Sequence, residues 1–121
     1  MTRVFLAEPQ TVVRSALRLV LSDLGMEVVG AAADWPAALE QAAPSRPDLL
    51  VVDWALIPTG ASLRDLRASC KEPVTIVLIS QLDAREQAAL AAGADTFISK
   101  GDTPDRVSER LQVAAAATRT R

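Results

Sequence analysis

The chain has 121 residues, of which 50% are hydrophobic, with a formal net charge of −2, one cysteine and no histidine. This length and hydrophobic content are typical of one globular domain with its own core, and they argue against disorder. The slight acidity does not suit a nucleic-acid-binding surface, which needs a basic stripe, and the lack of histidine excludes histidine-based catalysis and histidine-ligated metal sites.

The first third of the chain alternates short apolar segments with helical patterns. We expect a strand over 3–7, a helix over 10–24, a strand over 26–31 and a helix over 34–43. In the first helix, apolar residues recur every three or four positions and form one face, and Gly25 is a typical stop. Asp34 is a good N-cap for the second helix, because Pro36 then falls in the first turn, where its missing N–H costs little.

The stretch over 47–54 is the one around which the rest of the chain is organised. Its four apolar residues, 49–52, run without alternation into Asp53. A strand of this kind is buried on both faces, as in the centre of a parallel sheet covered by helices. Because sites in such sheets form beyond the carboxyl ends of the strands, Asp53 is the first candidate site residue.

The rest of the chain continues the alternation. We expect a loop over 54–60, a helix over 62–69, a strand over 74–80, a helix over 83–92, a strand over 96–99, a helix starting after Thr103 and a polar tail over 118–121. Asp83 and Glu86 stand at capping-box spacing and predict the start of the fourth helix. The short strand over 96–99 is expected at an edge of the sheet.

Five strands that alternate with five helices predict a parallel sheet with right-handed crossovers and helices on both faces. All the carboxyl ends of such strands lie at one edge. Glu8, Asp53, Ser80 and Lys100 each fall at the end of a strand. Two carboxylates, a hydroxyl and an ammonium therefore converge on one cleft, which suits an anion-and-cation site with a nucleophile.

Four segments of the chain resemble response regulator receiver domains, and the second is similar to receivers that carry a helix-turn-helix output domain. They are residues 6–17 (LAEPQTVVRSAL), 27–32 (EVVGAA), 47–53 (PDLLVVD) and 92–100 (AGADTFISK). The resemblance implies a flavodoxin-like (βα)5 three-layer sandwich, with a five-stranded parallel sheet of order 2-1-3-4-5. It also implies a receiver domain over 1–117, followed by a tail or the start of a linker over 118–121.

The resemblance further implies that a histidine kinase transfers a phosphoryl group to Asp53. Mg²⁺ would be held by Glu8, Asp53 and the main-chain carbonyl of Ala55, and would neutralise the charge on the phosphoryl group. Ser80 would donate a hydrogen bond to that group, and Lys100 would pair with it. Beyond self-phosphorylation and self-dephosphorylation at Asp53, no enzyme activity is expected.

A switch is implied as well, in which Ser80 moves inward and the ring of Phe97 fills the space left behind. The changed surface would be recognised by a second copy of the chain, as a homodimer, or by a C-terminal helix-turn-helix DNA-binding domain that is not in this chain. The receiver itself would bind neither nucleic acid nor membrane. A cytoplasmic location is expected, because Cys70 allows no internal disulfide and no apolar run approaches the ~20 residues that span a bilayer.

The chain departs from the family pattern after its first strand. Two adjacent acids are usual there, but Glu8 is followed by Pro9, which has no carboxylate, so the Mg²⁺ site should be weakened. Gln81 stands where a small residue is common and would crowd Asp53. A phosphorylation-independent pseudo-receiver that acts through dimerisation or protein binding is therefore the alternative, in which Asp53 only caps the loop that follows it.

An unrelated enzyme on the same fold is a weaker alternative. Flavin or nucleotide binding needs a loop rich in glycine or hydroxyl groups after the first strand, and residues 8–11 (EPQT) do not form one. The G-x-S-x-G elbow of hydrolases is absent from the sequence too.

Overall fold

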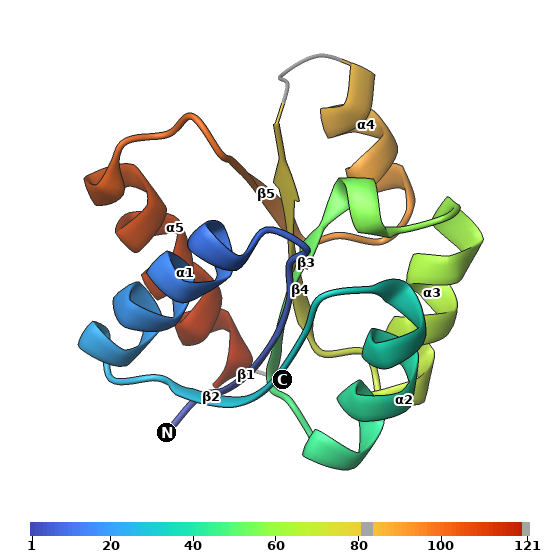
Figure 1. Cartoon of the computed structure of the whole chain (residues 1–121), viewed down its shortest axis with the longest axis horizontal. Coiled ribbons are helices and arrows are strands. Elements are labelled where there is room, and N and C mark those ends of the chain that lie inside the picture. Colours follow the sequence, from blue (N-terminus) through green and yellow to red (C-terminus); the bar gives the residue numbers. More distant parts are fainter. Residues whose placement is uncertain (81–83, 120–121) are drawn as a thin grey trace.

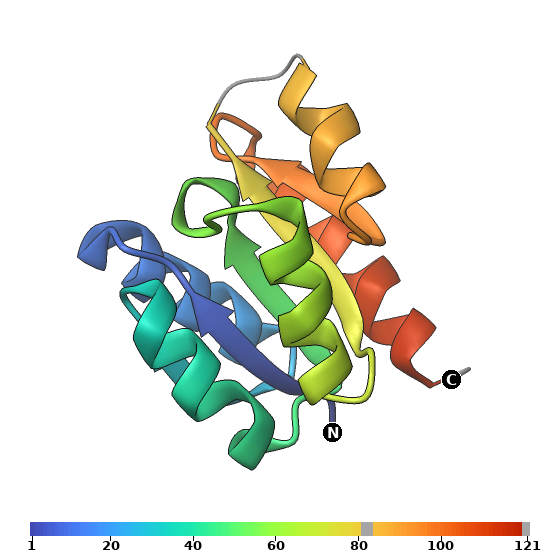
Figure 2. The ribbon, with the colours of Figure 1, turned by 90° about the vertical axis from the view of Figure 1, so that its right-hand side faces the viewer.

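The computed structural model describes residues 1–80 and 84–119, which form a five-stranded sheet in the order β2-β1-β3-β4-β5 (Figures 1 and 2). The strands are β1 (Arg3–Ala7), β2 (Glu27–Ala32), β3 (Leu49–Asp53), β4 (Val74–Ile79) and β5 (Thr96–Ser99). Every neighbouring pair of strands is parallel. The predicted α/β class, parallel sheet and strand order are confirmed.

Helices cover both faces of the sheet and give the predicted three layers. They are α1 (Thr11–Asp23), α2 (Trp35–Ser45), the short 3-10 helix η1 (Trp54–Leu56), α3 (Gly60–Ser69), α4 (Ala84–Ala91) and α5 (Pro104–Thr118). Figure 1 shows α1 and α5 on one side of the sheet and α2, α3 and α4 on the other. Within the described residues, no helix combines the length and apolar character needed to cross a bilayer.

The central strand β3 is buried on both faces, as its unbroken apolar run predicts. Leu49 and Val51 pack with the residues of α1 and α5, while Leu50 and Val52 pack with those of α2, α3 and α4. All four side chains are fully buried. Because burying one such side chain contributes about 1.5–3 kcal/mol, this strand anchors both halves of the core and fixes the position of Asp53 at its end.

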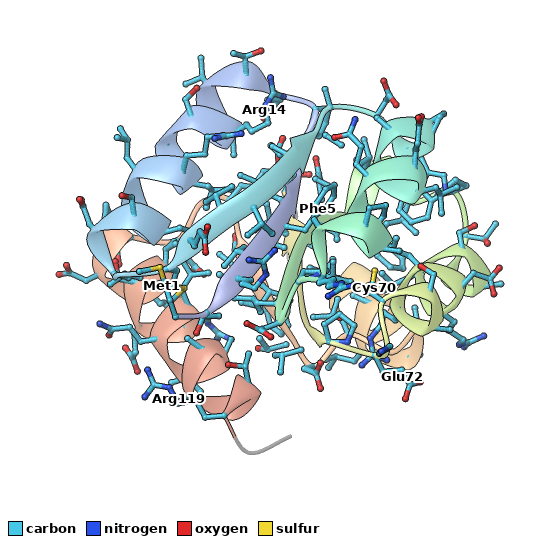
Figure 3. All side chains as sticks on the ribbon, turned by 90° about the horizontal axis from the view of Figure 1, so that it is seen from below. Met1, Phe5, Arg14, Cys70, Glu72 and Arg119 are labelled. Carbon is cyan, nitrogen blue, oxygen red and sulfur yellow. The ribbon has the colours of Figure 1, made fainter. Side chains whose placement is uncertain are left out.

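The pairing of β1 with β2 has one irregularity, a register shift between Val4 and Phe5 that places Phe5 opposite Gly30. Figure 3 shows Phe5 in the interior of the molecule. A Cβ atom on Gly30 would lie 3.0 Å from two carbons of the Phe5 ring, which is closer than ordinary van der Waals contact. A side chain at position 30 would press on the Phe5 ring, and glycine there lets the buried ring lie against the backbone of β2.

Two helix starts show how caps decide boundaries. Asp34 caps α2 as predicted, because its Oδ1 accepts a hydrogen bond from the Ala37 N–H at 2.8 Å. The predicted start of α3 at residue 62 is wrong by two residues, since the helix begins at Gly60. The reason is that Thr59 acts as the cap and accepts a hydrogen bond from the Ser62 N–H at 3.1 Å.

Two helix ends extend past their predicted limits. Helix α2 continues to Ser45 with Pro44 in its last turn, and Arg46 ends it in the left-handed conformation at φ 51°. Helix α5 includes Thr118, whose hydroxyl donates to the Ala115 carbonyl at 2.6 Å, so the tail begins later than predicted. The expected cap at Asp83, the crowding by Gln81 and the end of the tail at 120–121 lie outside the described residues.

Candidate functional site

The carboxyl ends of four neighbouring strands meet at one edge of the sheet. Asp53 is the last residue of β3, whereas Glu8, Ser80 and Lys100 directly follow β1, β4 and β5. Because the strands lie in the order β1-β3-β4-β5, Asp53 at the end of β3 has Glu8 on one side and Ser80 and Lys100 on the other. The structure thus places all four sequence candidates along the same edge.

Lys100 joins the two acids into one group, here called the carboxylate–lysine cluster (Glu8, Asp53 and Lys100). Its Nζ lies 2.9 Å from Asp53 Oδ2 and 3.0 Å from Glu8 Oε1. Glu8 is fully buried and Asp53 is 3% exposed, so these are ion pairs largely shielded from water. Two carboxylates against one ammonium leave the cluster with a net negative charge.

The electrostatics of the cluster hold Lys100 in its charged form. Burial alone lowers the pKa of a lysine, but the hydrogen bonds and negative charges of Asp53 and Glu8 outweigh it and raise the pKa of Lys100 above its ordinary value. At neutral pH the cluster therefore presents an ammonium that is shared between two carboxylates.

The two oxygens of Asp53 have different partners. Oδ2 accepts from Lys100, while Oδ1 accepts from the Ala55 N–H at 3.1 Å and caps the short helix η1. Asp53 therefore does cap the loop that follows it, but only through Oδ1, and Oδ2 remains bound to Lys100. The main chain of Ala55, which the sequence predicts to supply a carbonyl to a metal, borders the carboxylate.

Glu8 is held from several sides. Its N–H donates to the Ala32 carbonyl at 3.0 Å, and its own carbonyl accepts from the Arg14 guanidinium at 2.7 Å. Oε1 accepts both from Lys100 and from the Gln10 N–H at 3.1 Å. The other carboxylate oxygen, Oε2, is buried and makes no hydrogen bond with the described residues.

Gln10 and Arg14 border the site although the sequence patterns did not predict them there. The side-chain oxygen of Gln10 lies 3.4 Å from Lys100 Nζ, so the amide borders the carboxylate–lysine cluster. The sequence carries only a weak signal, because glutamine is not a preferred N-cap residue, and this does not tell what its side chain contacts. In the structure Gln10 occupies the N-cap position of α1 and its side chain makes no capping hydrogen bond. Arg14 lies one helical turn later and binds the Glu8 carbonyl.

Ser80 and Phe97 lie outside the carboxylate–lysine cluster. Ser80 is exposed at the rim, and it leaves β4 beside Lys100, whose N–H donates to the Ile79 carbonyl at 2.8 Å. The ring of Phe97 is partly buried and faces the Arg110 guanidinium, whose central carbon is 5.1 Å from the ring centroid. The switch implied for these two residues remains a prediction.

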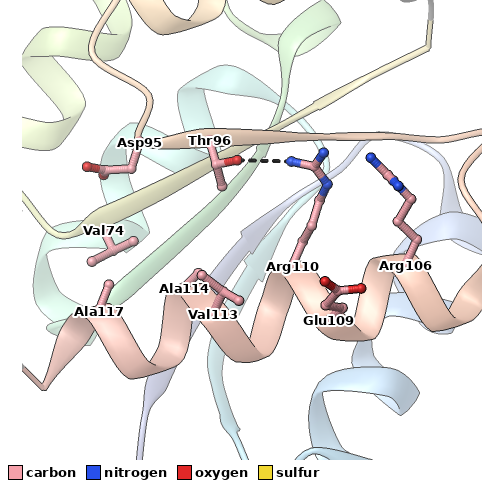
Figure 4. A pocket seen from close by; sticks show the side chains of 9 residues that line it. All are labelled: Val74, Asp95, Thr96, Arg106, Glu109, Arg110, Val113, Ala114 and Ala117. Atoms are coloured by element: carbon pink, nitrogen blue, oxygen red, sulfur yellow. Dashed lines mark hydrogen bonds between the residues drawn. The ribbon is translucent and has the colours of Figure 1, made fainter.

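A separate pocket of about 360 Å³ lies along α5 and the start of β5 (Figure 4). Its lining mixes apolar residues with both signs of charge: Val74, Asp95, Thr96, Arg106, Glu109, Arg110, Val113, Ala114 and Ala117. Figure 4 shows Arg110 reaching across it to the Thr96 hydroxyl, at 3.3 Å. It includes no member of the carboxylate–lysine cluster, so it is not part of the candidate site.

A parallel sheet of this order, with two acids and a lysine at the carboxyl ends of its strands, is what the resemblance to receiver domains predicts. The family model of the response regulator receiver domain matches residues 4–112. The chain belongs to this family.

Known proteins agree with this assignment. The KDP operon transcriptional regulatory protein KdpE of Escherichia coli K12 is 36% identical over 117 residues, which cover 94% of this chain and 51% of KdpE. The chain thus spans about half the length of that relative. A two-component response regulator of the LuxR family from Aurantimonas has the same fold, with a TM-score of 0.84, 23% identity and coverage of 97% of this chain and 86% of that one.

A third neighbour is the receiver domain of the sensor histidine kinase PA1611 from Pseudomonas aeruginosa PAO1. Its TM-score is 0.80 at 22% identity, with coverage of 95% of this chain and 98% of that one, and its crystal structure has a magnesium ion coordinated in the active-site cleft. At this level of identity the likeness shows the fold alone. The comparisons do not favour the pseudo-receiver alternative.

Proposed function

We propose that Asp53 accepts a phosphoryl group from a phosphohistidine of a histidine kinase. The observation that carries this proposal is the buried Asp53 carboxylate, whose Oδ2 is held at 2.9 Å by the Lys100 ammonium. A carboxylate oxygen forms a bond to phosphorus while the bond from phosphorus to the imidazole nitrogen breaks, and the electron pair returns to that nitrogen. The donor histidine belongs to the kinase, because this chain has none.

Lys100 and Ser80 act on the product of this step. The ammonium of Lys100, a compact charge on a flexible stem, moves from the carboxylate to an oxygen of the new phosphoryl group. Ser80, exposed at the same rim, donates a hydrogen bond to another of its oxygens. Both interactions stabilise the acyl phosphate, and both change the surroundings of β4 and β5.

The residues present fit a weakened Mg²⁺ site. Magnesium binds oxygen ligands, and the buried Oε2 of Glu8 is an anionic oxygen without a hydrogen bond to the described residues. Asp53 and the main-chain carbonyl of Ala55 would be the other ligands. When bound, Mg²⁺ supplies positive charge to the transferring phosphoryl oxygens.

The weakness follows from Pro9, which offers no oxygen in place of the usual second acid. Across the described residues, no three acidic, thiol or imidazole side chains come together in a way that could hold a metal. Lys100 also forms ion pairs with both carboxylates, so Mg²⁺ has to compete with its ammonium for them.

Downstream, we propose that the receiver, over 1–117, switches an output domain outside this chain. KdpE, of which the match covers about half, is a transcriptional regulatory protein, and this supports an output in transcription. A helix-turn-helix DNA-binding domain, which the sequence resemblance implies, would be that output. Ser80 and Phe97 would carry the change to a surface used by a homodimer or by that domain. The receiver would act in the cytoplasm, where histidine kinases deliver their phosphoryl groups, and would catalyse only its own phosphorylation and dephosphorylation.

Transfer is tested by intact-protein mass after incubation with a small phosphodonor and Mg²⁺. The wild type should gain the mass of one phosphoryl group, and Asp53→Asn should gain none. Asp65→Asn, at an exposed acid of α3, is the matched control and should behave like the wild type. No uptake by the wild type, or equal uptake by Asp53→Asn, would overturn the proposal.

A further inference from the structure

We propose that Gln10 takes over the role of the missing second acid, with its side-chain carbonyl oxygen serving as a ligand for a divalent cation bound by Glu8 and Asp53. This inference rests on the proposed function, since it names a further ligand for the Mg²⁺ site described above. It assigns a role to a residue that neither the sequence patterns nor the family pattern single out.

Three side-chain oxygens lie around the Lys100 ammonium, two from the segment that follows β1 (Glu8 and Gln10) and one from the end of β3 (Asp53). Nζ of Lys100 lies 2.9 Å from Asp53 Oδ2, 3.0 Å from Glu8 Oε1 and 3.4 Å from Gln10 Oε1. These three oxygens therefore converge on the position of the Lys100 ammonium. Gln10 contributes the one oxygen of the three that is neutral.

Two hydrogen bonds fix the backbone of Gln10 beside Glu8, and its side chain takes part in no helix cap. Its N–H donates to Glu8 Oε1 at 3.1 Å, and its carbonyl accepts from the Arg14 N–H at 2.9 Å. Although Gln10 is the N-cap of α1, its side chain makes no capping hydrogen bond. The amide is thus tethered beside the acids and does not serve the helix.

Glu8 supplies a second and independent observation. Its Oε2 is fully buried and has no hydrogen bond with the described residues, although leaving a buried carboxylate oxygen without a partner is unfavourable. A divalent cation held by the Glu8 carboxylate would give that oxygen a partner, whereas the Lys100 ammonium contacts only Oε1.

The chemistry of the donors sets the expected strength. Hard divalent cations accept amide carbonyl oxygens as ligands alongside carboxylates. A neutral oxygen adds less attraction than the carboxylate that an aspartate would bring at position 9. Binding should therefore be weaker than in a receiver with two adjacent acids, but it should depend on Gln10.

The test is a Mg²⁺ titration followed by the fluorescence of Trp54, which adjoins Asp53, in a Trp35→Phe background that leaves a single tryptophan. Gln10→Ala should weaken Mg²⁺ binding roughly tenfold, the size of effect expected for a group that supports a metal site. Gln10→Glu, which keeps the length and adds a charge, should strengthen it. Gln41→Ala, at an exposed glutamine of α2, is the matched control and should leave it unchanged.

A second comparison separates a ligand from a residue with a merely structural role. In a Pro9→Asp background the restored acid should strengthen binding, and Gln10→Ala should then cost less than in the parent. Thermal unfolding of each variant checks that the fold is kept.

The inference is overturned if Gln10→Ala binds Mg²⁺ like the parent, if Gln10→Glu brings no gain, or if the parent shows no binding at all. If Mg²⁺-dependent phosphoryl uptake persists while Gln10 variants bind as the parent does, only this inference fails. If the parent takes up no phosphoryl group, the proposed function fails instead.

Discussion

Replacing Lys100 with methionine should destabilise the fold through the two acids that it leaves behind. The ammonium is the common partner of Asp53 Oδ2, at 2.9 Å, and Glu8 Oε1, at 3.0 Å. Methionine keeps most of the length and packing of the side chain but carries no charge. The variant therefore leaves two buried carboxylates facing each other without a cation between them.

The size of the effect follows from these distances. Two oxygens that each lie about 3 Å from one nitrogen are at most about 6 Å apart, and two like charges at that separation repel by about 3 kcal/mol at an effective dielectric constant of 20. In the wild type the attraction of both acids to the ammonium offsets this repulsion, and the variant removes that attraction while the repulsion remains. Removing one partner of a buried ion pair typically costs about 3–5 kcal/mol, which is consistent. We expect the free energy of unfolding to fall by about 3 kcal/mol, and the melting temperature by roughly 10 °C.

Urea unfolding followed by circular dichroism, without divalent cations, measures this loss. Lys71→Met is the matched control, because Lys71 is the only other lysine and is exposed. It should change stability by less than about 0.5 kcal/mol. Added Mg²⁺ should stabilise Lys100→Met more than the wild type, since its competitor is gone. Equal stability of Lys100→Met and the wild type would refute the placement of Lys100 between two buried charges.

Three further predictions concern the fold and its pH dependence. Gly30→Ala should lower the free energy of unfolding by about 1–2 kcal/mol in the same assay, because the new methyl group presses on the buried Phe5 ring; an unchanged midpoint would contradict this contact. Asp95→Ala should cost about 1–2 kcal/mol, since Asp95 Oδ2 accepts from the Thr75 N–H at 2.7 Å at the start of β4; thermal unfolding checks it. Because the pKa of Lys100 is raised in the folded state, its stabilisation is complete below about pH 10.5 and is lost as pH rises through that raised value. Alkaline unfolding curves of the wild type should show this loss, and those of Lys100→Met should lack it.

The sequence predicts most of the fold because its strongest signals do not depend on distant contacts. The unbroken apolar run before Asp53 requires burial on both faces, and regular alternation with helices then requires a parallel sheet. Once the sheet is parallel, residues that end different strands share an edge. This is why Glu8 and Lys100, 92 positions apart, were predicted as neighbours and are bonded in the structure.

What the sequence did not predict depends on single side chains. Nothing in a pattern tells whether Gln10 caps its helix or turns towards the acids, because both fit a polar residue at a helix start. The contact of Arg110 with the ring of Phe97 could not be predicted either. It depends on how the long arginine side chain extends from α5 to β5, and the sequence pattern carries no information on that. The start of α3 was missed because Thr59, a good cap, stands just before a glycine that had been assigned to the loop.

The central claim is that Asp53 and Lys100 together hold a phosphoryl group at the edge of the sheet. The most direct measurement is a titration with beryllofluoride, which mimics a phosphoryl group on a carboxylate, followed by Trp54 fluorescence in the Trp35→Phe background. The account predicts a saturable change that Asp53→Asn abolishes and Lys100→Met weakens. No change in the parent protein, or the same change in Asp53→Asn, would contradict it.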